Sequence, residues 1–399
     1  MSGAGADARV VRLTPRASKL AAKHHPWFFA DDLAEVNAED GDLVRVTDAR
    51  GREVALGFFA ARSRLRLRLC GIAAETFDDA EAFFRQRLRD ALARRAPLLA
   101  PLAGVRLVHG EADGLPGLVV DAYADCVVLQ ATTAAVERHL DCIVPPLVEA
   151  LSPRMVLARH DAATRRLEGL PLEVRLLHGR SVESVEIEEH GVRHEVRPFD
   201  GHKTGFYLDQ SPARALVKAH AAGRRALDLF GYQGAFSLAA LAGGASAALL
   251  VDQSGAALER AIAGAVRNGC TGLEVRRANA FDAVRELRTA GARFDLVIVD
   301  PPAFAKSRRE RDGALRGYRD LNRQAMRLLA PGGRLLSCSC SHHVRWPEFE
   351  DTLRQAAAAL PFRMLLRARV MAGPDHPVWI GLPESEYLKV AWLERADPR

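Results

Sequence analysis

Two cysteines and two histidines lie within the eight-residue segment SCSCSHHV (337–344). Such a set could form a metal site, a disulfide, a redox pair or a cysteine nucleophile. A structural zinc site is disfavoured, because the C-x-C-x-H-H spacing does not supply the two ligand pairs that these sites use. A disulfide between Cys338 and Cys340 would be strained, because only one residue separates them. We therefore expect no metal site, and a reactive thiol is the chemistry that the rest of the chain must support.

Strand and helix patterns alternate from residue 199 onward, and they determine where this segment lies. The predicted strands are RALDLF, AALLVD, LEVRRAN, RFDLVIVD and RLLSCS, and helical patterns separate them. This alternation predicts an α/β fold with a doubly wound, mostly parallel sheet. Ligands bind such sheets at the carboxyl ends of the strands. Cys340 ends the last of these strands and is expected at the binding edge, whereas Cys338 is expected in the core.

Two acidic residues and two glycines in this region predict a cofactor site. Asp228 lies in LDLFGYQGAFS, where the chain turns through Gly231 and Gly234 into a helix, and Asp252 ends the next strand. Glycines let a ligand approach the backbone, and these carboxylates can accept hydrogen bonds from an amine or from ribose hydroxyls. The segment is not the G-x-G-x-x-G pattern of dinucleotide sites. The set therefore predicts S-adenosylmethionine, an adenosine-like ligand with an amino-acid moiety and no phosphates, with S-adenosylhomocysteine as product.

The sharpest motif is DLVIVDPPAF, in which Asp300 follows an apolar strand. Pro301 and Pro302 fix a rigid extended turn that donates no backbone hydrogen bonds. Such a turn can present an acidic group to the edge of an unpaired base while an aromatic side chain, here Phe304, packs on its face. The alternative is a strand-ending aspartate before an ordinary proline turn. The basic segment AKSRRERDGALRGYRD follows, and we interpret it, including Lys306, as a mobile loop along an RNA backbone.

The N-terminal segment RSRLRLRLC (62–70) alternates arginine and leucine with a period of two. This period predicts a strand whose one face carries Arg62, Arg64, Arg66 and Arg68. Four guanidinium groups on one face suit a phosphate backbone, and the alternative is a solvated strand face. The net charge of +6 also favours a polyanionic partner, although the arginine-rich composition accounts for part of it.

Three regions of the chain differ in pattern, as its length of 399 residues leads one to expect. Residues 1–75 show short β patterns, residues 76–190 mix helical and strand patterns, and residues 191–399 carry the strand–helix alternation. The longest apolar run is split by Gly243 and Gly244, and the N-terminus shows no apolar signal core, so neither a membrane span nor secretion is expected. Six mostly scattered cysteines favour a reducing cytoplasm over a disulfide framework.

Several motifs, taken in order, resemble those of bacterial 23S rRNA (cytosine-5) methyltransferases that carry an N-terminal PUA domain. They are GHKTGFYLDQSPAR, LDLFGYQGAFS, VDPPAFAKS, GYRDLNRQAMRLLAPGG, SCSCS and DHPVWIGLPESEYLK, and KHHPWFFADDL and EADGLPGLVVD extend the likeness over nearly the whole chain. The resemblance implies a PUA RNA-binding domain, a small central α/β domain and a Rossmann-like class I methyltransferase domain. It also implies cytoplasmic action on 23S rRNA or a large-subunit precursor, and it is compatible with a homodimer.

Carried over position by position, the resemblance implies Cys340 as the nucleophile and Asp300 as the acid of the D-P-P-x-F turn. It places the cofactor against Asp228 and Asp252, and we expect further cofactor contacts from Phe230, Gly231, Gly234, Asn279, Ala280 and Asp300. For Tyr207, Asp209 and Gln210 of GHKTGFYLDQ a contact with the cofactor is expected, and a contact with the base is the alternative. The RNA would meet Pro301, Pro302, Phe304 and Lys306, together with the four arginines of the N-terminal region. Two positions depart from related patterns. Asn279 stands where the family often has an acid near the adenine, and Ala303 where other RNA cytosine-5 families have a second cysteine.

The expected reaction is therefore formation of 5-methylcytosine through a covalent Cys340 adduct at cytosine C6. Two alternatives remain open. In the first, DPPAF holds an amine or ring nitrogen of guanine or adenine for N-methylation, and both cysteines are bystanders. In the second, the protein is a non-catalytic RNA-binding or ribosome-assembly factor that uses its PUA-like face.

Overall fold

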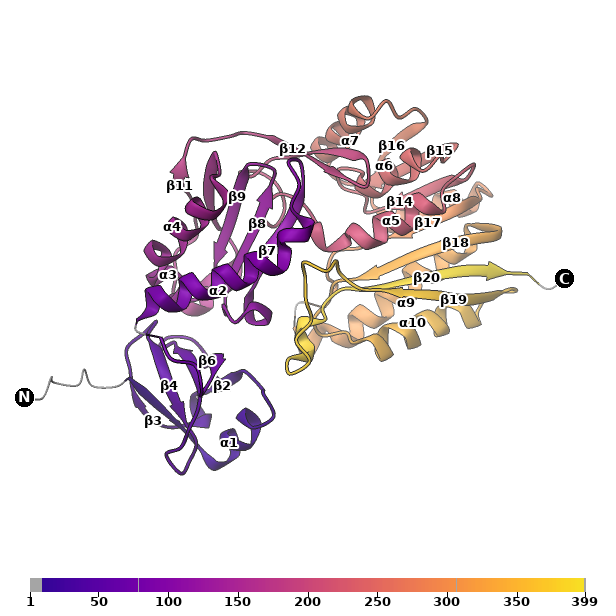
Figure 1. The fold of residues 1–399 in the computed structure, drawn as a ribbon. Helices are drawn as coiled ribbons and strands as arrows, with labels where there is room; N and C mark the ends of the chain where they lie inside the picture. Colours follow the sequence, from indigo (N-terminus) through magenta and orange to yellow (C-terminus); the bar gives the residue numbers. More distant parts are fainter. Residues whose placement is uncertain (1–8, 78, 306, 398–399) are drawn as a thin grey trace, which may run out of the picture. The chain divides into compact units, whose positions relative to one another are not determined.

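The N-terminal region forms a six-stranded sheet with the order β2-β6-β5-β4-β1-β3. The computed structural model describes residues 9–77, 79–305 and 307–397 of the chain. The elements of this region are β1 (Val10–Leu13), α1 (Pro15–Ala21), β2 (Trp27–Phe29), β3 (Leu33–Asn37), β4 (Leu43–Thr47), β5 (Glu53–Phe59) and β6 (Leu65–Ile72) (Figure 1). Inward-facing side chains such as Val11, Phe28 and Leu67 are fully buried in a core of their own. The predicted small, β-rich N-terminal domain is thus confirmed.

The arginine-rich strand of this sheet is shorter than predicted. β6 begins after Arg64, so Arg62 and Arg64 lie in the preceding bend, where both are exposed. Ser63 is buried, and its hydroxyl accepts a hydrogen bond from the backbone N–H of Leu65 at 3.2 Å. Such a local side-chain bond competes with the strand ladder. The expectation that four arginines share one strand face is therefore wrong, because only Arg66 and Arg68 do.

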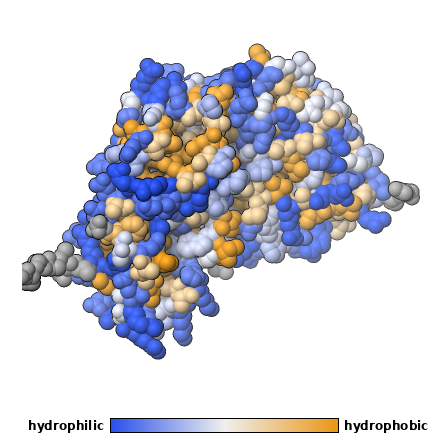
Figure 2. Space-filling model, viewed as in Figure 1, coloured by the Kyte–Doolittle hydropathy of each residue, from blue (hydrophilic) through white to orange (hydrophobic). Residues whose placement is uncertain are grey.

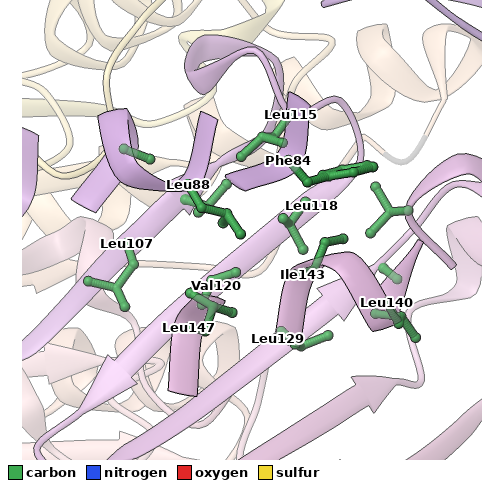
Figure 3. Close-up of a cluster of buried hydrophobic side chains, with 14 of the residues drawn as sticks. Phe84, Leu88, Leu107, Leu115, Leu118, Val120, Leu129, Leu140, Ile143 and Leu147 are labelled. Atoms are coloured by element: carbon green, nitrogen blue, oxygen red, sulfur yellow. The ribbon is translucent and has the colours of Figure 1, made fainter. Parts of the chain in front are cut away.

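The central region forms a five-stranded sheet with the order β11-β10-β9-β8-β7. Its elements are α2 (Ala80–Arg95), β7 (Gly104–His109), β8 (Leu118–Tyr123), β9 (Cys126–Ala131), α3 (Ala134–Arg138), α4 (Leu140–Leu151), β10 (Met155–His160) and β11 (Glu173–Gly179). Figure 3 shows its core, in which side chains of α2 and α4 meet side chains of the sheet. This apolar cluster holds the two helices on the sheet.

Leu129 of β9 is fully buried within this cluster (Figure 3). We expect Leu129→Ala to lower the free energy of unfolding by about 2–5 kcal/mol, because the lost methyl groups leave a cavity. Leu167→Ala is the matched control, because the Leu167 side chain is 67% exposed. Urea unfolding followed by circular dichroism measures both changes. Equal effects of the two substitutions would contradict the assignment of Leu129 to the core.

The C-terminal region forms a seven-stranded sheet with the order β16-β15-β14-β17-β18-β20-β19. The strands are β14 (Arg225–Leu229), β15 (Ala247–Asp252), β16 (Leu273–Arg277), β17 (Phe294–Val299), β18 (Leu329–Ser339), β19 (Arg363–Val370) and β20 (Lys389–Ala396). The helices are α5 (Ser211–Ala219), α6 (Ala235–Ala242), α7 (Gly255–Arg267), α8 (Ala280–Thr289), α9 (Arg311–Arg327) and α10 (Trp346–Ala358). β14 to β18 pair in parallel, and β20 pairs antiparallel with β18 and β19.

Helices cover both faces of this sheet, because successive strand residues point to opposite sides. Leu227 and Leu229 pack with α8, α9 and α10, whereas Ala226 packs with α5 and α6 on the other face. Burial on both sides explains why the strands read as nearly continuous apolar runs. The predicted doubly wound, mostly parallel sheet is confirmed.

The chain divides into two compact units. The first unit holds the N-terminal and central sheets together with residues 196–208 and 374–385, and the second unit holds residues 188–195, 209–373 and the chain from 386 onward. A hairpin of β12 (Val185–Glu189) and β13 (Val192–Val196) connects the central sheet to the C-terminal one along the chain. The predicted boundaries near residues 75 and 190 stay a prediction.

Buried polar contacts attach the two late segments to the first unit. Asp375 accepts the backbone N–H of Arg106 through Oδ2 at 2.9 Å, and its carbonyl oxygen accepts the guanidinium of Arg95 at 3.1 Å. The hydroxyls of Tyr123 and Thr204 lie 2.7 Å apart. Parts of the GHKTGFY and DHPVW motifs therefore belong to the unit built around the central sheet.

No helix in the described ranges is long and apolar enough to cross a membrane. The longest apolar run of the sequence instead forms α6, a turn at Gly243 and Gly244, and β15, as predicted. Figure 2 shows a face on which hydrophilic residues predominate and hydrophobic residues form separate groups.

Candidate active site

Four polar residues lie at the carboxyl ends of neighbouring strands in the C-terminal sheet. Asp228 is in β14, Asp252 ends β15, Asp300 follows β17, and Cys340 follows β18. Because β15, β14, β17 and β18 are consecutive parallel neighbours, their carboxyl ends share one edge. The fold therefore gathers the two carboxylates predicted for the cofactor and the two residues predicted for catalysis.

Asp228 carries a fully buried carboxylate. Its Oδ2 accepts the backbone N–H of Ser237 at 3.1 Å and the Ser237 hydroxyl at 2.7 Å. Its Oδ1 is buried and has no hydrogen-bond partner among the described residues. Burial, with a contribution from the charge of Asp252, raises the pKa of Asp228 to about 6. An unused oxygen on a buried carboxylate favours a cationic hydrogen-bond donor as ligand.

The turn between β14 and α6 keeps the space beside this carboxylate clear. Phe230 and Tyr232 adopt φ angles of 64° and 49°, a left-handed conformation that is costly for residues with a Cβ. A Cβ at Gly231 would lie 2.8 Å from the carboxyl carbon of Asp228, so only glycine fits. Gly234, with φ of 75°, leads into α6. The backbone can therefore approach a ligand here, as the glycine spacing predicted.

Asp252 supports the same turn from the neighbouring strand. Its Oδ2 accepts the backbone N–H of Tyr232 at 3.0 Å, and its Oδ1 accepts that of Ser254 at 2.8 Å. Each carboxylate oxygen can accept a second hydrogen bond. The half-buried Asp252 can therefore brace the turn and still accept from ribose hydroxyls.

Asn279 caps the helix that follows β16. Its Oδ1 accepts the N–H of Phe281 at 2.9 Å, which satisfies one of the unpaired donors at the start of α8. Ala280 is buried, and the Phe281 and Phe230 rings lie 6.2 Å apart. The cap uses one lone pair of the amide oxygen, and the adenine contact expected for Asn279 stays a prediction.

The Cys340 thiol lies directly beside the DPP turn. Its Sγ is 3.9 Å from the carbonyl oxygen of Pro301, and the residue is half-buried. Pro301 is buried and Pro302 is exposed. The centroid of the Phe304 ring lies 4.7 Å from the centroid of the Tyr318 ring and 6.1 Å from that of the Phe281 ring. The predicted nucleophile, the predicted acid and an aromatic side chain thus come from two adjacent strand ends.

Cys338 is fully buried, as predicted, but it has a second feature that the sequence did not indicate. Its thiol interacts with the side chains of Asp300 and Gln210. Burial first, and then the charge of Asp300, raises the pKa of Cys338 well above the ordinary thiol value. Cys338 is therefore a neutral thiol in contact with the predicted catalytic acid.

Lys389, at the start of β20, is a site residue that the sequence analysis missed. Its side chain is buried, and Nζ donates to the carbonyl oxygens of Ser341 at 2.8 Å and Tyr387 at 2.6 Å. Burial lowers the pKa of Lys389 to about 8, and the nearby Cys340 opposes this shift. A lysine that opens an apolar strand is rare enough to have been a signal, because the chain has only six lysines.

The residues of GHKTGFYLDQ divide between the two units. In the second unit, Asp209 accepts the Tyr387 hydroxyl at 2.6 Å, and Gln210 reaches Cys338. Tyr207 belongs to the first unit, where its hydroxyl lies 3.0 Å from Nδ1 of His202. The cofactor contacts predicted for Tyr207 and Asp209 stay predictions.

Predicted RNA-contacting residues have varied surroundings. Arg68 forms an ion pair with Glu111 at 3.0 Å, and its side chain is 18% exposed. Lys306 lies outside the described residues. From Arg311 onward the basic segment is the helix α9 and not a mobile loop, so that interpretation is wrong. The helix forms because Ala314, Tyr318 and Leu321 recur at helical spacing and are buried.

The donor set at this strand edge fits S-adenosylmethionine. Asp228 offers a buried anionic oxygen to an amino group, Asp252 offers acceptors to ribose, and the turn at Gly231 admits close approach. Within residues 9–77, 79–305 and 307–397, no three His, Cys, Asp or Glu side chains are grouped as metal ligands.

The sequence matches two protein families. Residues 157–377 match the S-adenosylmethionine-dependent methyltransferase family, and residues 11–70 match a PUA-like domain. Among curated proteins, the ribosomal RNA large subunit methyltransferase I of Aeromonas salmonicida is 37% identical over 386 residues, covering 95% of this chain and 97% of that protein. The protein of the same name from Shewanella frigidimarina is 36% identical over 387 residues, with the same coverage.

Solved structures agree with the fold. The protein SMU.776, crystallised with SAH, superimposes with a TM-score of 0.84 at 20% identity, covering 97% of this chain and all of that one. A protein from Streptococcus mutans gives a TM-score of 0.82 at 21% identity, with the same coverage. At these identities the likeness establishes the fold.

Proposed function

The chain belongs to the family of S-adenosylmethionine-dependent methyltransferases that includes ribosomal RNA large subunit methyltransferase I, and on that premise we propose that it methylates C5 of a cytosine in 23S rRNA. The observation that carries this proposal is the half-buried Cys340 thiol, 3.9 Å from the carbonyl oxygen of Pro301 in the DPP turn. N-methylation does not require a thiol at this place, whereas methylation of a pyrimidine carbon does.

The need for the thiol follows from the chemistry of cytosine. C5 is a poor nucleophile in the aromatic ring. Addition of the Cys340 thiolate to C6 forms a carbon–sulfur bond and gives C5 the character of an enamine carbon. S-adenosylmethionine supplies an electrophilic methyl group. Once C5 has gained the methyl group, a base removes the C5 proton, the electron pair restores the C5–C6 double bond, and the thiolate leaves.

The other residues of the site have roles that fit this sequence of steps. Asp300 would bind the N3/N4 edge of the base and stabilise the charge that develops in the ring. Phe304 would pack on the face of a base that has left its stack. Asp228 would hold the amino group of the cofactor, and Asp252 its ribose.

The substrate and its surroundings complete the proposal. The curated relatives are named for large-subunit rRNA, and the match to a PUA-like domain supports an RNA-binding role for residues 11–70. We propose three domains, at residues 1–75, 76–190 and 191–399, and action in the cytoplasm, with a homodimer as a compatible assembly. Of the four arginines predicted to meet a phosphate backbone, Arg62 and Arg64 are exposed, whereas Arg66 and Arg68 are half-buried.

Nucleoside mapping tests the proposed reaction. Large-subunit rRNA from cells without the protein is incubated with the purified enzyme and S-adenosylmethionine, digested and examined by mass spectrometry. We expect one new 5-methylcytidine. A methyl group on a guanine or adenine nitrogen would replace the proposal with N-methylation. An enzyme that binds RNA but no S-adenosylmethionine would indicate a non-catalytic factor.

A further inference from the structure

Lys389 lies next to the proposed nucleophile because of the strand register. It opens β20 and pairs with Ser339, the last residue of β18, and Cys340 follows Ser339 in the chain. The antiparallel pairing therefore carries a cationic side chain to the same strand end as the thiol.

The Lys389 ammonium is fixed but is not neutralised by a carboxylate. Two carbonyl oxygens, from Ser341 and Tyr387, accept its hydrogen bonds at 2.8 and 2.6 Å. In the described part of the chain, no carboxylate lies within ion-pair distance of it. Its side chain is 1% exposed, so water does not solvate the charge. A buried charge held only by neutral dipoles is expensive unless an anion lies nearby.

Three anionic or ionisable groups face this ammonium. Cys340 has the largest influence, followed by Glu386 in the segment before β20 and Glu348 in α10. All three oppose the effect of burial, which lowers the pKa of Lys389. On its other sides, Cys340 interacts with the buried Tyr318 hydroxyl and with Cys338. Lys389 is thus a buried cation that interacts electrostatically with the Cys340 thiol.

We propose that Lys389 is a positioning residue whose buried ammonium stabilises the thiolate form of Cys340. The inference deepens the proposed function, since it supplies the anion that adds to cytosine C6. Hydrogen bonds to the carbonyl oxygens of Ser341 and Tyr387 hold the Lys389 ammonium in position. Because Lys389 is buried, water does not screen its charge from the Cys340 thiolate. The thiol would then be reactive at neutral pH before RNA or cofactor arrives.

Alkylation of Cys340 tests this inference without using activity. Wild type, Lys389→Met and Lys389→Arg are treated with iodoacetamide across a pH series, and peptide mass spectrometry follows modification of Cys340. We expect Lys389→Met to slow alkylation at pH 7 at least tenfold, about one pKa unit of the thiol, and Lys389→Arg to recover part of the rate. Lys19→Met, at an exposed position of α1, is the matched control and should not alter the rate. An unchanged pH profile in folded Lys389→Met would overturn the proposal.

A reciprocal measurement covers the case in which Lys389→Met does not fold. Cys340→Ser is nearly isosteric, and nuclear magnetic resonance of ¹³C-labelled lysines can follow Lys389 among only six lysines. Removing the thiolate should lower the Lys389 pKa, because the coupling acts equally on both groups. No change in Cys340→Ser would reject the inference. Both experiments use enzyme without RNA, so they remain decisive even if nucleoside mapping rejects cytosine-5 methylation.

Discussion

Replacing Cys340 with alanine is expected to reduce methyl transfer to rRNA at least about 10³-fold, because the proposed addition to cytosine C6 needs the Cys340 thiolate. The affinity for S-adenosylmethionine should not change, since Cys340 is not among the predicted cofactor contacts. Transfer of radioactive methyl groups to rRNA measures the first quantity, and calorimetric titration measures the second. Cys270→Ala is the matched control. Cys270 is also half-buried and lies in the second unit, but it precedes β16 at the opposite edge of the sheet.

Trapping of the adduct distinguishes a nucleophile from a thiol that only shapes the site. RNA containing 5-fluorocytidine should accumulate a covalent complex with the wild type, because the fluorine at C5 cannot leave as a proton would. The complex should survive denaturing electrophoresis and be absent with Cys340→Ala. Normal turnover by Cys340→Ala would exclude covalent catalysis and favour methylation of a base nitrogen.

Asp228→Asn should weaken binding of S-adenosylmethionine at least about 100-fold, the equivalent of about 2.7 kcal/mol. The substitution keeps the shape of the side chain but removes the negative charge that Oδ1 would offer to the cofactor's amino group. Calorimetric titration of the apoenzyme measures the loss. Asp295→Asn is the control. Asp295 accepts the backbone N–H of Arg225 at 2.9 Å, at the amino ends of β14 and β17 and therefore away from the proposed cofactor site.

The pH dependence gives this prediction a signature of its own. Burial raises the pKa of Asp228 from 3.8 to about 6, so its contribution to stability is full below about pH 3.8 and is lost as pH rises through 6. The affinity for the cofactor depends on pH in the opposite direction. Binding needs the ionised carboxylate of Asp228, so the affinity should fall as pH falls from 7 to 5. Asp228→Asn should remove this part of the pH dependence without lowering thermal stability at pH 7. Equal affinity of wild type and Asp228→Asn would show that another group holds the amino group.

Local patterns in the sequence were sufficient to predict the fold class and most of the residues at the carboxyl ends of the parallel strands. The alternation of strands and helices predicted the parallel sheet. Because Asp228 and Asp252 each come near the end of a predicted strand, the sequence also predicted that they lie side by side. These inferences succeed because period and burial are properties of a single element, and because parallel strands necessarily place their carboxyl ends together. The glycine turn was predictable for a similar local reason, since Gly231 has no room for a Cβ.

The errors arose where local patterns compete. The charges between residues 306 and 319 favoured a loop, but buried residues at helical spacing, Tyr318 among them, make the segment from Arg311 a helix. The arginine–leucine alternation extended the predicted strand over Arg62 and Arg64, where a serine turn interrupts it.

Sequence alone therefore determined the sheet, the cofactor class and the position of Cys340 at a strand end. Only the tertiary structure decided which groups surround that thiol. Asp300 meets Cys338 because β17 and β18 are neighbours, and Lys389 reaches the same end because β20 runs antiparallel to β18. Such contacts join residues far apart in the chain, and they depend on strand order and register, which no local period encodes.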